Sequence, residues 1–227
     1  ALNFAANGFK TIKQRDGSGA LAGFGSAKGS NEEAYLVQKL VRQGFKTNNV
    51  DHCTRLCHAS SVAALMEGIN SGAVTAPFTA ALDSDCIIVI GARPAQNHPV
   101  AATYIKQAAR KQKLSRYADH MLQFTPGRDV ALLNAMIHTI IEEGLTDQQY
   151  VQAMTDGFDE IVDNVKHFAP EAMAVVCGID AEEIRTVARR YATAERSLIF
   201  WGMGISQHIH GTDNVRSLIT LAAITGQ

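Results

Sequence analysis

Two thiols with neighbouring histidines form the group of residues with the clearest potential for chemistry. Cys53 and Cys57 stand four positions apart in the sequence Asp-His-Cys-Thr-Arg-Leu-Cys-His-Ala-Ser, which begins at Asp51. Thiolate and imidazole are the side chains that soft or borderline transition metals prefer. A thiol is also activated when a cation, a metal or a helix N-terminus lowers its pKa. The alternative is that both cysteines are small, semi-buried residues in a turn.

The residues that follow predict how this group is held. An apolar run predicts a helix over Val62–Ile69, and Ser60 and Ser61 are expected to cap it. Cys57 and His58 would then lie just before the positive end of that helix. This placement favours a reactive or metal-binding thiol at Cys57. Cys53 is expected to be a packing residue, because its spacing fits neither a dithiol-redox motif nor an easily wrapped zinc site.

Alternating apolar patterns predict the fold class. The continuous apolar runs Asp85–Gly91 and Ser197–Gly202 are typical of strands covered on both faces, and Leu21–Gly25 predicts a short strand. Helices are expected at Ala1–Ile12, Glu32–Arg42, Val62–Ile69, Val100–Lys111, Val130–Glu143, Asp147–Met154, Ala181–Ala192 and Asn214–Thr225. The order predicts an α/β fold with a doubly wound, mostly parallel, Rossmann-like sheet that has helices on both faces.

Glycine-containing loops follow both long strands. One begins at Gly91 and the other at Gly202, and the carboxyl ends of parallel strands are where such folds bind ligands. Glycines there would let backbone amides approach phosphate groups closely. A third glycine group, Gly23, Gly25 and Gly29, departs from the dinucleotide fingerprint because its last glycine is one residue late. We therefore expect a turn before the helix at residue 31, and no NAD bound by this chain itself.

The amino-acid composition of the chain excludes some classes of binding partner. The 227 residues are 46% hydrophobic with a formal net charge of −1 and no Lys/Arg cluster, so neither nucleic acid nor an anionic membrane is an expected partner. No apolar run reaches the roughly 18 residues of a membrane span, and no signal peptide is visible. Four cysteines without a small-secreted pattern predict a reducing compartment, and we expect the cytoplasm.

Six segments carry a resemblance to a known family. They are Gly25–Glu33, Asn48–Asp51, Cys57–Val62, Gly91–Pro99, Pro126–Asn134 and Trp201–His208. Together they resemble the alpha subunits of molybdenum- or tungsten-dependent formate dehydrogenases, in the molybdopterin oxidoreductase family. The Cys-His pair followed by Ser-Val, with Trp-Gly-Met-Gly downstream, resembles the formate branch of that family. The resemblance covers nearly the whole chain, which would be a central fragment of a larger multidomain subunit.

The resemblance implies a cofactor and residues that hold it. The cofactor would be molybdenum or tungsten bis(molybdopterin guanine dinucleotide), with Cys57 as the metal's protein ligand and His58 as the catalytic histidine. Asp129 would accept the paired N–H donors of guanine; an N-cap of the helix at Val130 is the alternative. The family most often has Asn where Arg93 stands. The cofactor contacts implied are Gly91, Arg93, Asp129, Gly202, Met203, Gly204, Gln207 and His208.

The resemblance also implies an activity and partners. Formate would be oxidised to carbon dioxide, and iron–sulfur centres and a flavin-containing subunit would carry the electrons to NAD or another acceptor. The iron–sulfur segment would precede Ala1. Residues 1–52 would end one α/β domain and residues 53–227 would form the pterin-binding domain, including the Cys-His turn. The isolated fragment is expected to be inactive and to hold no cofactor.

Two other functions remain open from the sequence. One is a sister molybdopterin oxidoreductase such as a nitrate reductase. The other is a non-catalytic fragment, or a small zinc-binding module built on His52, Cys53, Cys57 and His58. A departure from the family also stands near Lys113 and Leu114, where the expected strand is missing. About a dozen residues are expected to be absent there, either by deletion or because a disordered stretch is missing; in the second case the two Cα atoms should lie well beyond the ~3.8 Å of a trans peptide.

Overall fold

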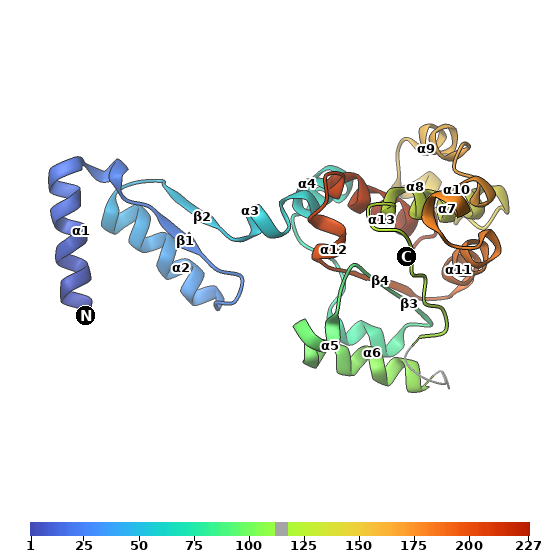
Figure 1. The fold of residues 1–227 in the computed structure, drawn as a ribbon, viewed down its shortest axis with the longest axis horizontal. Helices are drawn as coiled ribbons and strands as arrows, with labels where there is room; N and C mark the ends of the chain where they lie inside the picture. The colour runs from blue at the N-terminus through green and yellow to red at the C-terminus, as the bar shows by residue number, and fades with distance from the viewer. Residues whose placement is uncertain (112–117) are drawn as a thin grey trace. The chain divides into compact units, whose positions relative to one another are not determined.

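The structure, a computed structural model, describes residues 1–111 and 118–227 (Figure 1). The predicted departure at Lys113 and Leu114 lies outside the described residues. The chain divides into two compact units, Ala1–Ala59 and Ser60–Gln227. The unit boundary falls a few residues after the domain boundary predicted between residues 52 and 53, so Cys57 and His58 belong to the first unit. Their assignment to a pterin-binding domain stays a prediction.

The first unit is built from short elements. In chain order they are α1 (Leu2–Asp16), η1 (Ser18–Ala20), β1 (Gly23–Gly25), α2 (Asn31–Lys39), the π-helical η2 (Leu40–Phe45), β2 (Val50–His52) and α3 (Thr54–Cys57). β1 and β2 are parallel, with Gly23 opposite Val50. The predicted turn before residue 31 is present: Ser30 Oγ accepts from Glu33 N, and the Glu33 carboxylate accepts from Ser30 N, a capping box that starts α2.

The second unit holds the longer elements. In chain order they are α4 (Ala59–Ile69, which starts at the last residue of the first unit), η3 (Phe78–Asp83), β3 (Cys86–Ile90), α5 (Pro94–Asn97), α6 (Pro99–Lys111), α7 (Asp129–Glu142), α8 (Gln148–Met154), α9 (Phe158–Val165), α10 (Pro170–Cys177), α11 (Ala181–Thr193), β4 (Ser197–Trp201), α12 (Met203–Ser206) and α13 (Gly211–Ile224). Sequence patterns missed α9 and α10, each shorter than three turns.

A parallel strand pair and an apolar helix organise this unit. β3 and β4 pair in register from Cys86 opposite Ser197 to Ile90 opposite Trp201. α7 packs against α10, α11 and α13 on one side of the strands, and η3, α5 and α6 lie on the other side (Figure 1). The apolar sequence of α7 explains its central place, since Leu133, Ile137 and Ile140 are almost completely buried. The predicted α/β class, with parallel strands and helices on both faces, is confirmed.

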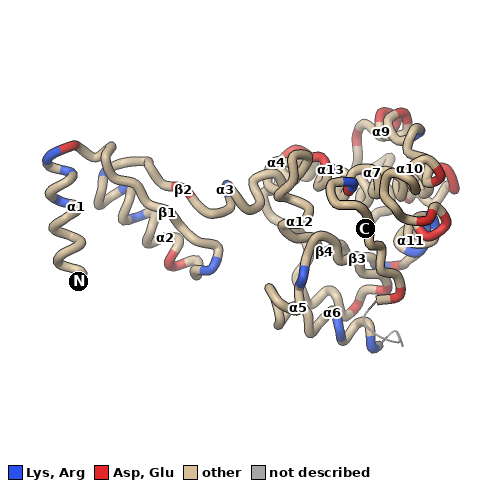
Figure 2. Tube along the Cα trace, viewed as in Figure 1, with Lys and Arg blue, Asp and Glu red and all other residues tan. Residues whose placement is uncertain are grey.

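Charged residues of both signs occur along α9–α11 (Figure 2). Arg185 on α11 pairs with Glu142 at 2.7 Å and with Glu171 at 3.0 Å, which links α11 to α7 and α10. Arg189 adds a pair with Glu143 at 2.8 Å. Ion pairs at a protein surface contribute little to stability. Because these arginines bridge three helices, their ion pairs favour one arrangement of α7, α10 and α11.

Candidate functional site

The loops after β3 and β4 meet backbone to backbone. Gly204 N donates to Gly91 O at 2.9 Å, and Gly202 N donates to Ile90 O at 3.2 Å. A Cβ on Gly204 would lie 2.6 Å from Gly91 Cα, and Gly91 has a φ of +59°, which favours glycine. The structure therefore brings these loops together, as their positions after parallel strands predicted. The glycines are needed first for the contact between the two loops themselves.

The polar and long side chains of the same loops are exposed. Arg93 stands at the N-cap position of α5, and Met203, Gln207 and His208 lie in and just after α12. All four residues are exposed, so a ligand at this sheet edge has access to them. Their roles as cofactor contacts stay predictions.

Asp129 is a buried carboxylate at the first residue of α7. Its exposed fraction is 4%, and burial raises the pKa of its carboxyl, while its own backbone N–H and His208 act in the opposite direction. The N-cap alternative was wrong, because Arg128 occupies the N-cap position and no side chain caps the helix there. A carboxylate at a positive helix end, near an exposed histidine, is suited to accept paired N–H donors.

The Cys-His pair lies between two helices. Cys57 is the last residue of α3, and α4 begins directly after His58. Cys57 is a free, partly buried thiol, and partial burial lowers the pKa of the His58 imidazole below its ordinary value. A free sulfur donor beside a predominantly neutral imidazole suits a soft metal and proton transfer.

The other thiol and histidine serve local structure. His52 Nδ1 accepts from Thr54 N at 3.1 Å and lies 2.7 Å from Thr54 Oγ1, so it stabilises the start of α3. Cys53 is exposed, and its sulfur accepts from Ala27 N at 3.3 Å; the prediction that Cys53 is packed was wrong. Among the residues that the structure describes, no group of three or more His, Cys, Asp or Glu could hold a metal ion. The zinc-module alternative therefore has no support in this geometry.

Hydrogen bonds that the sequence did not reveal fix the start of α4. Ser60 Oγ donates to Ser206 O at 2.7 Å, and Ser61 Oγ and Ser206 Oγ are 2.7 Å apart. Trp201 Nε1 donates to Ser61 Oγ at 3.1 Å. The prediction that both serines cap a helix from Val62 was wrong, because α4 already begins at Ala59. No local pattern could have found this cluster, since its partners lie about 140 residues apart.

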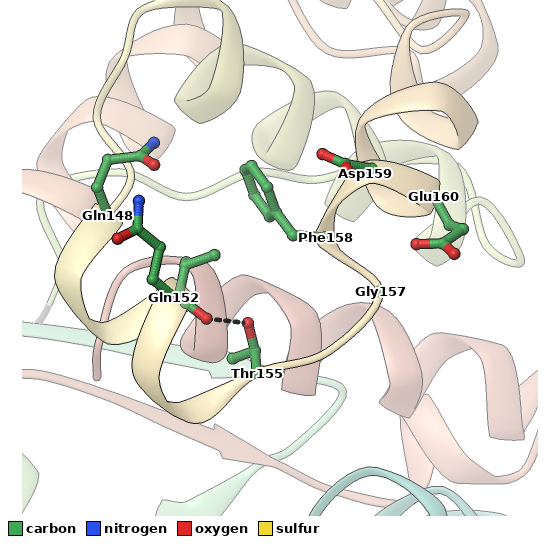
Figure 3. A pocket seen from close by; sticks show the side chains of 8 residues that line it. Gln148, Gln152, Thr155, Gly157, Phe158, Asp159 and Glu160 are labelled. Carbon is green, nitrogen blue, oxygen red and sulfur yellow. Dashed lines mark hydrogen bonds between the residues drawn. The ribbon is translucent and has the colours of Figure 1, made fainter.

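A shallow pocket lies elsewhere in the second unit, between α8 and α9 (Figure 3). Gln148 and Gln152 line it from α8, and Phe158, Asp159 and Glu160 from α9. Thr155 Oγ1 donates to Val151 O at 2.7 Å at its floor. The pocket is lined by none of the predicted site residues.

Comparisons with known proteins find matches that cover the whole chain. A family model described as molybdopterin oxidoreductase matches residues 1–227. Formate dehydrogenase H of Escherichia coli is 39% identical over 238 residues, covering 100% of this chain and 33% of that protein. The F420-dependent formate dehydrogenase subunit alpha of Methanocaldococcus jannaschii is 38% identical, covering 100% of this chain and 34% of that protein. The chain thus spans about one third of the length of these relatives.

A solved structure shares the fold. Acetylene hydratase from Pelobacter acetylenicus superposes with a TM-score of 0.82 at 25% identity, over 99% of this chain and 32% of that one. The described part of the chain contains no helix with the length and apolar character that a bilayer span requires.

Proposed function

Because this chain belongs to the molybdopterin oxidoreductase family, we propose that it is the central part of a formate dehydrogenase catalytic subunit. The observation that carries this proposal is the Cys57-His58 pair, a free sulfur donor beside an imidazole with a lowered pKa, at the start of α4. Identities of 38–39% to two proteins named formate dehydrogenases support formate as the substrate.

Cys57 would be the protein ligand of a molybdenum or tungsten centre. When bound, that centre accepts the two electrons released as formate becomes carbon dioxide and a proton. The donor set fits such a centre, since a thiolate sulfur can ligate a molybdenum or tungsten centre that also carries dithiolene sulfurs. His58 would accept the proton on an imidazole nitrogen, because burial keeps that imidazole predominantly neutral at pH 7.

The second unit would hold the pterin and its nucleotide. Asp129 would accept the paired N–H donors of guanine, and its buried, helix-start position supports this role. Arg93 carries a positive charge at the exposed sheet edge, where it would face a phosphate. The remaining contacts proposed there are Gly91, Gly202, Met203, Gly204, Gln207 and His208.

The whole protein would work with electron carriers. An iron–sulfur cluster, and a partner subunit with iron–sulfur and flavin centres, would take the electrons to NAD or another acceptor. The name of one relative as a subunit alpha supports a multi-subunit assembly. All four cysteines are free thiols, which supports a reducing compartment and a cytoplasmic location.

The test uses the full-length protein purified from its source. We expect roughly one molybdenum or tungsten per catalytic subunit, formate-dependent reduction of a dye, and no nitrate reduction with reduced dye. Nitrate turnover without formate turnover would replace the proposal with a nitrate reductase. One zinc per chain, lost in Cys53→Ala, would replace it with the zinc module.

A further inference from the structure

The short helix α12, in the loop after β4, has both buried and exposed residues. Ile205 and Ser206 are 0% and 5% exposed. Met203, at the start of the helix, and Gln207, just after its end, are exposed. A helix of one turn is unstable by itself, because few backbone hydrogen bonds offset the cost of ordering its residues. The position of α12 must therefore come from contacts with other elements of the second unit.

Asn214, in the first turn of α13, holds the backbone of α12. It is 2% exposed, and its Nδ2 donates to Ile205 O at 2.9 Å. Carbonyl groups at the end of a helix lack partners within the helix, so the Asn214 amide supplies one from outside. The two elements are in close contact here, since a Cβ on Gly211 would lie 2.1 Å from Ser206 O. Loss of the Asn214 donor would leave this buried contact without its hydrogen bond.

Ser61 holds the same turn from α4. It is 4% exposed, and its hydroxyl oxygen lies 2.7 Å from Ser206 Oγ. Trp201 Nε1 donates to Ser61 Oγ at 3.1 Å, so one hydroxyl connects the last residue of β4 with the last residue of α12. Since buried hydroxyls cost stability unless they are paired, this cluster favours one position of α12 against α4.

We propose that Asn214 and Ser61 are positioning residues for α12, and through it for the cofactor contacts proposed at Met203 and Gln207. This inference rests on the proposed function. The two residues reach α12 from different helices of the second unit and hold two consecutive residues of the turn. Gln207 follows directly, so a shift of the turn would move it. A binding site needs its contacts held to within about 0.5 Å by supporting hydrogen bonds.

The experiment compares variants of the full-length protein by amide hydrogen exchange. Asn214→Asp replaces the amide donor by a group of the same size, and Ser61→Ala removes the hydroxyl that pairs with α12. Their matched controls are Asn134→Asp and Ser217→Ala. Asn134 and Ser217 are each 7% exposed, and the 3.2 Å hydrogen bond from Ser217 Oγ to Asn134 Oδ1 joins α13 to α7 without involving α12. Peptides covering residues 201–210 report on α12, and α11 peptides report on global stability.

We expect exchange in residues 201–210 to accelerate about tenfold in Asn214→Asp and in Ser61→Ala, the effect of losing one buried hydrogen bond. Exchange there should not change in Asn134→Asp or Ser217→Ala. Unchanged exchange in residues 201–210, or equal acceleration in the matched controls, would overturn the inference. If Asn214→Asp does not fold, Ser61→Ala decides by the same criterion.

Cofactor release and the spectrum of the metal test the link from α12 to the ligand. During dialysis, full-length Asn214→Asp and Ser61→Ala should lose guanine nucleotide faster than their matched controls. At equal metal content, their Mo(V) or W(V) electron paramagnetic resonance spectra should differ from that of the wild type, and the spectra of the controls should not. Wild-type release and spectra in both variants would overturn the positioning role while formate oxidation by the wild type stands. A wild type that binds no molybdenum or tungsten would instead overturn the proposed function, and the positioning role with it.

Discussion

The two compact units of this chain differ in what stabilises them. In the first unit, α1 and α2, every residue of which the structure describes, contain no buried residue, and Leu2 and Phe4 are each 87% exposed. Its core is Leu21, Val41 and Phe45, so capping and backbone hydrogen bonds carry much of its structure. In the second unit, nine of the fourteen residues of α7 are buried. The Cys-His pair therefore belongs to the sparsely packed unit, whereas the loops that begin at Gly91 and Gly202 lie on the densely packed one.

The largest effect is expected from the thiols of the first unit. In the full-length protein, Cys57→Ala should reduce formate oxidation by more than about a hundredfold, because it would remove the proposed protein ligand of the metal. Cys53→Ala should reduce formate oxidation by less than about tenfold, because that thiol is exposed and its partners are Ala27 N and the neighbouring His52 ring. Dye-linked formate assays, with metal content measured in parallel, give the comparison. Equal losses in both variants would contradict the assignment of Cys57.

Substitutions in the two cores should show that the two units unfold independently of each other. Leu133→Ala is expected to destabilise the second unit by about 2–5 kcal/mol, since Leu133 is 1% exposed at the centre of α7. Trp201, the single tryptophan, lies in the second unit and reports its urea unfolding by fluorescence. Val41→Ala, which alters only the small core of the first unit, should leave that transition in place while making the first unit easier to cleave by protease. A matched shift of the Trp201 transition by Val41→Ala would show that the units unfold together.

Glycine substitutions should act in opposite directions in the two units. Gly204→Ala places a Cβ 2.6 Å from Gly91 Cα, so the loops must separate, and we expect a loss of about 1–3 kcal/mol in the urea transition. Gly8→Ala in α1 meets nothing within 4 Å and should raise helix stability by about 0.5–1 kcal/mol, as seen by circular dichroism. A neutral Gly204→Ala would mean that the loop contact is not tight in solution.

The smallest effect concerns Asp129. Burial raises the pKa of its carboxyl above the ordinary 3.8, so the folded state holds the proton more tightly than the unfolded state. Stability is therefore lost as the pH rises from 3.8 through the folded-state pKa, and Asp129→Asn should recover on the order of 1 kcal/mol at pH 7. Thermal unfolding of the cofactor-free chain from pH 4 to 8 measures this. In the full-length protein, Asp129→Asn should retain less guanine nucleotide than the wild type. If Asp129→Asn is no more stable than the wild type at pH 7, the buried charge of Asp129 does not destabilise the fold.

Local sequence patterns determined much of the fold. The apolar runs at residues 85–91 and 197–202 predicted β3 and β4, because a strand that is buried on both faces has a continuous apolar sequence. The apolar residues at helical spacing after Asp129 predicted α7. Motif resemblance identified the family along the whole chain. Two helices of eight residues each, α9 and α10, were not predicted.

The surroundings of the candidate site were decided by tertiary structure. From sequence, Ser60 and Ser61 looked like helix caps and Asp129 had an N-cap as its alternative role, because Ser and Asp favour helix starts wherever they occur. Packing instead pairs Ser61 with Ser206, buries Asp129 near His208 and closes Gly204 on Gly91. Sequence periodicity records which face of an element is buried but not which distant element covers it, so contacts across a hundred residues or more are fixed only when the chain folds.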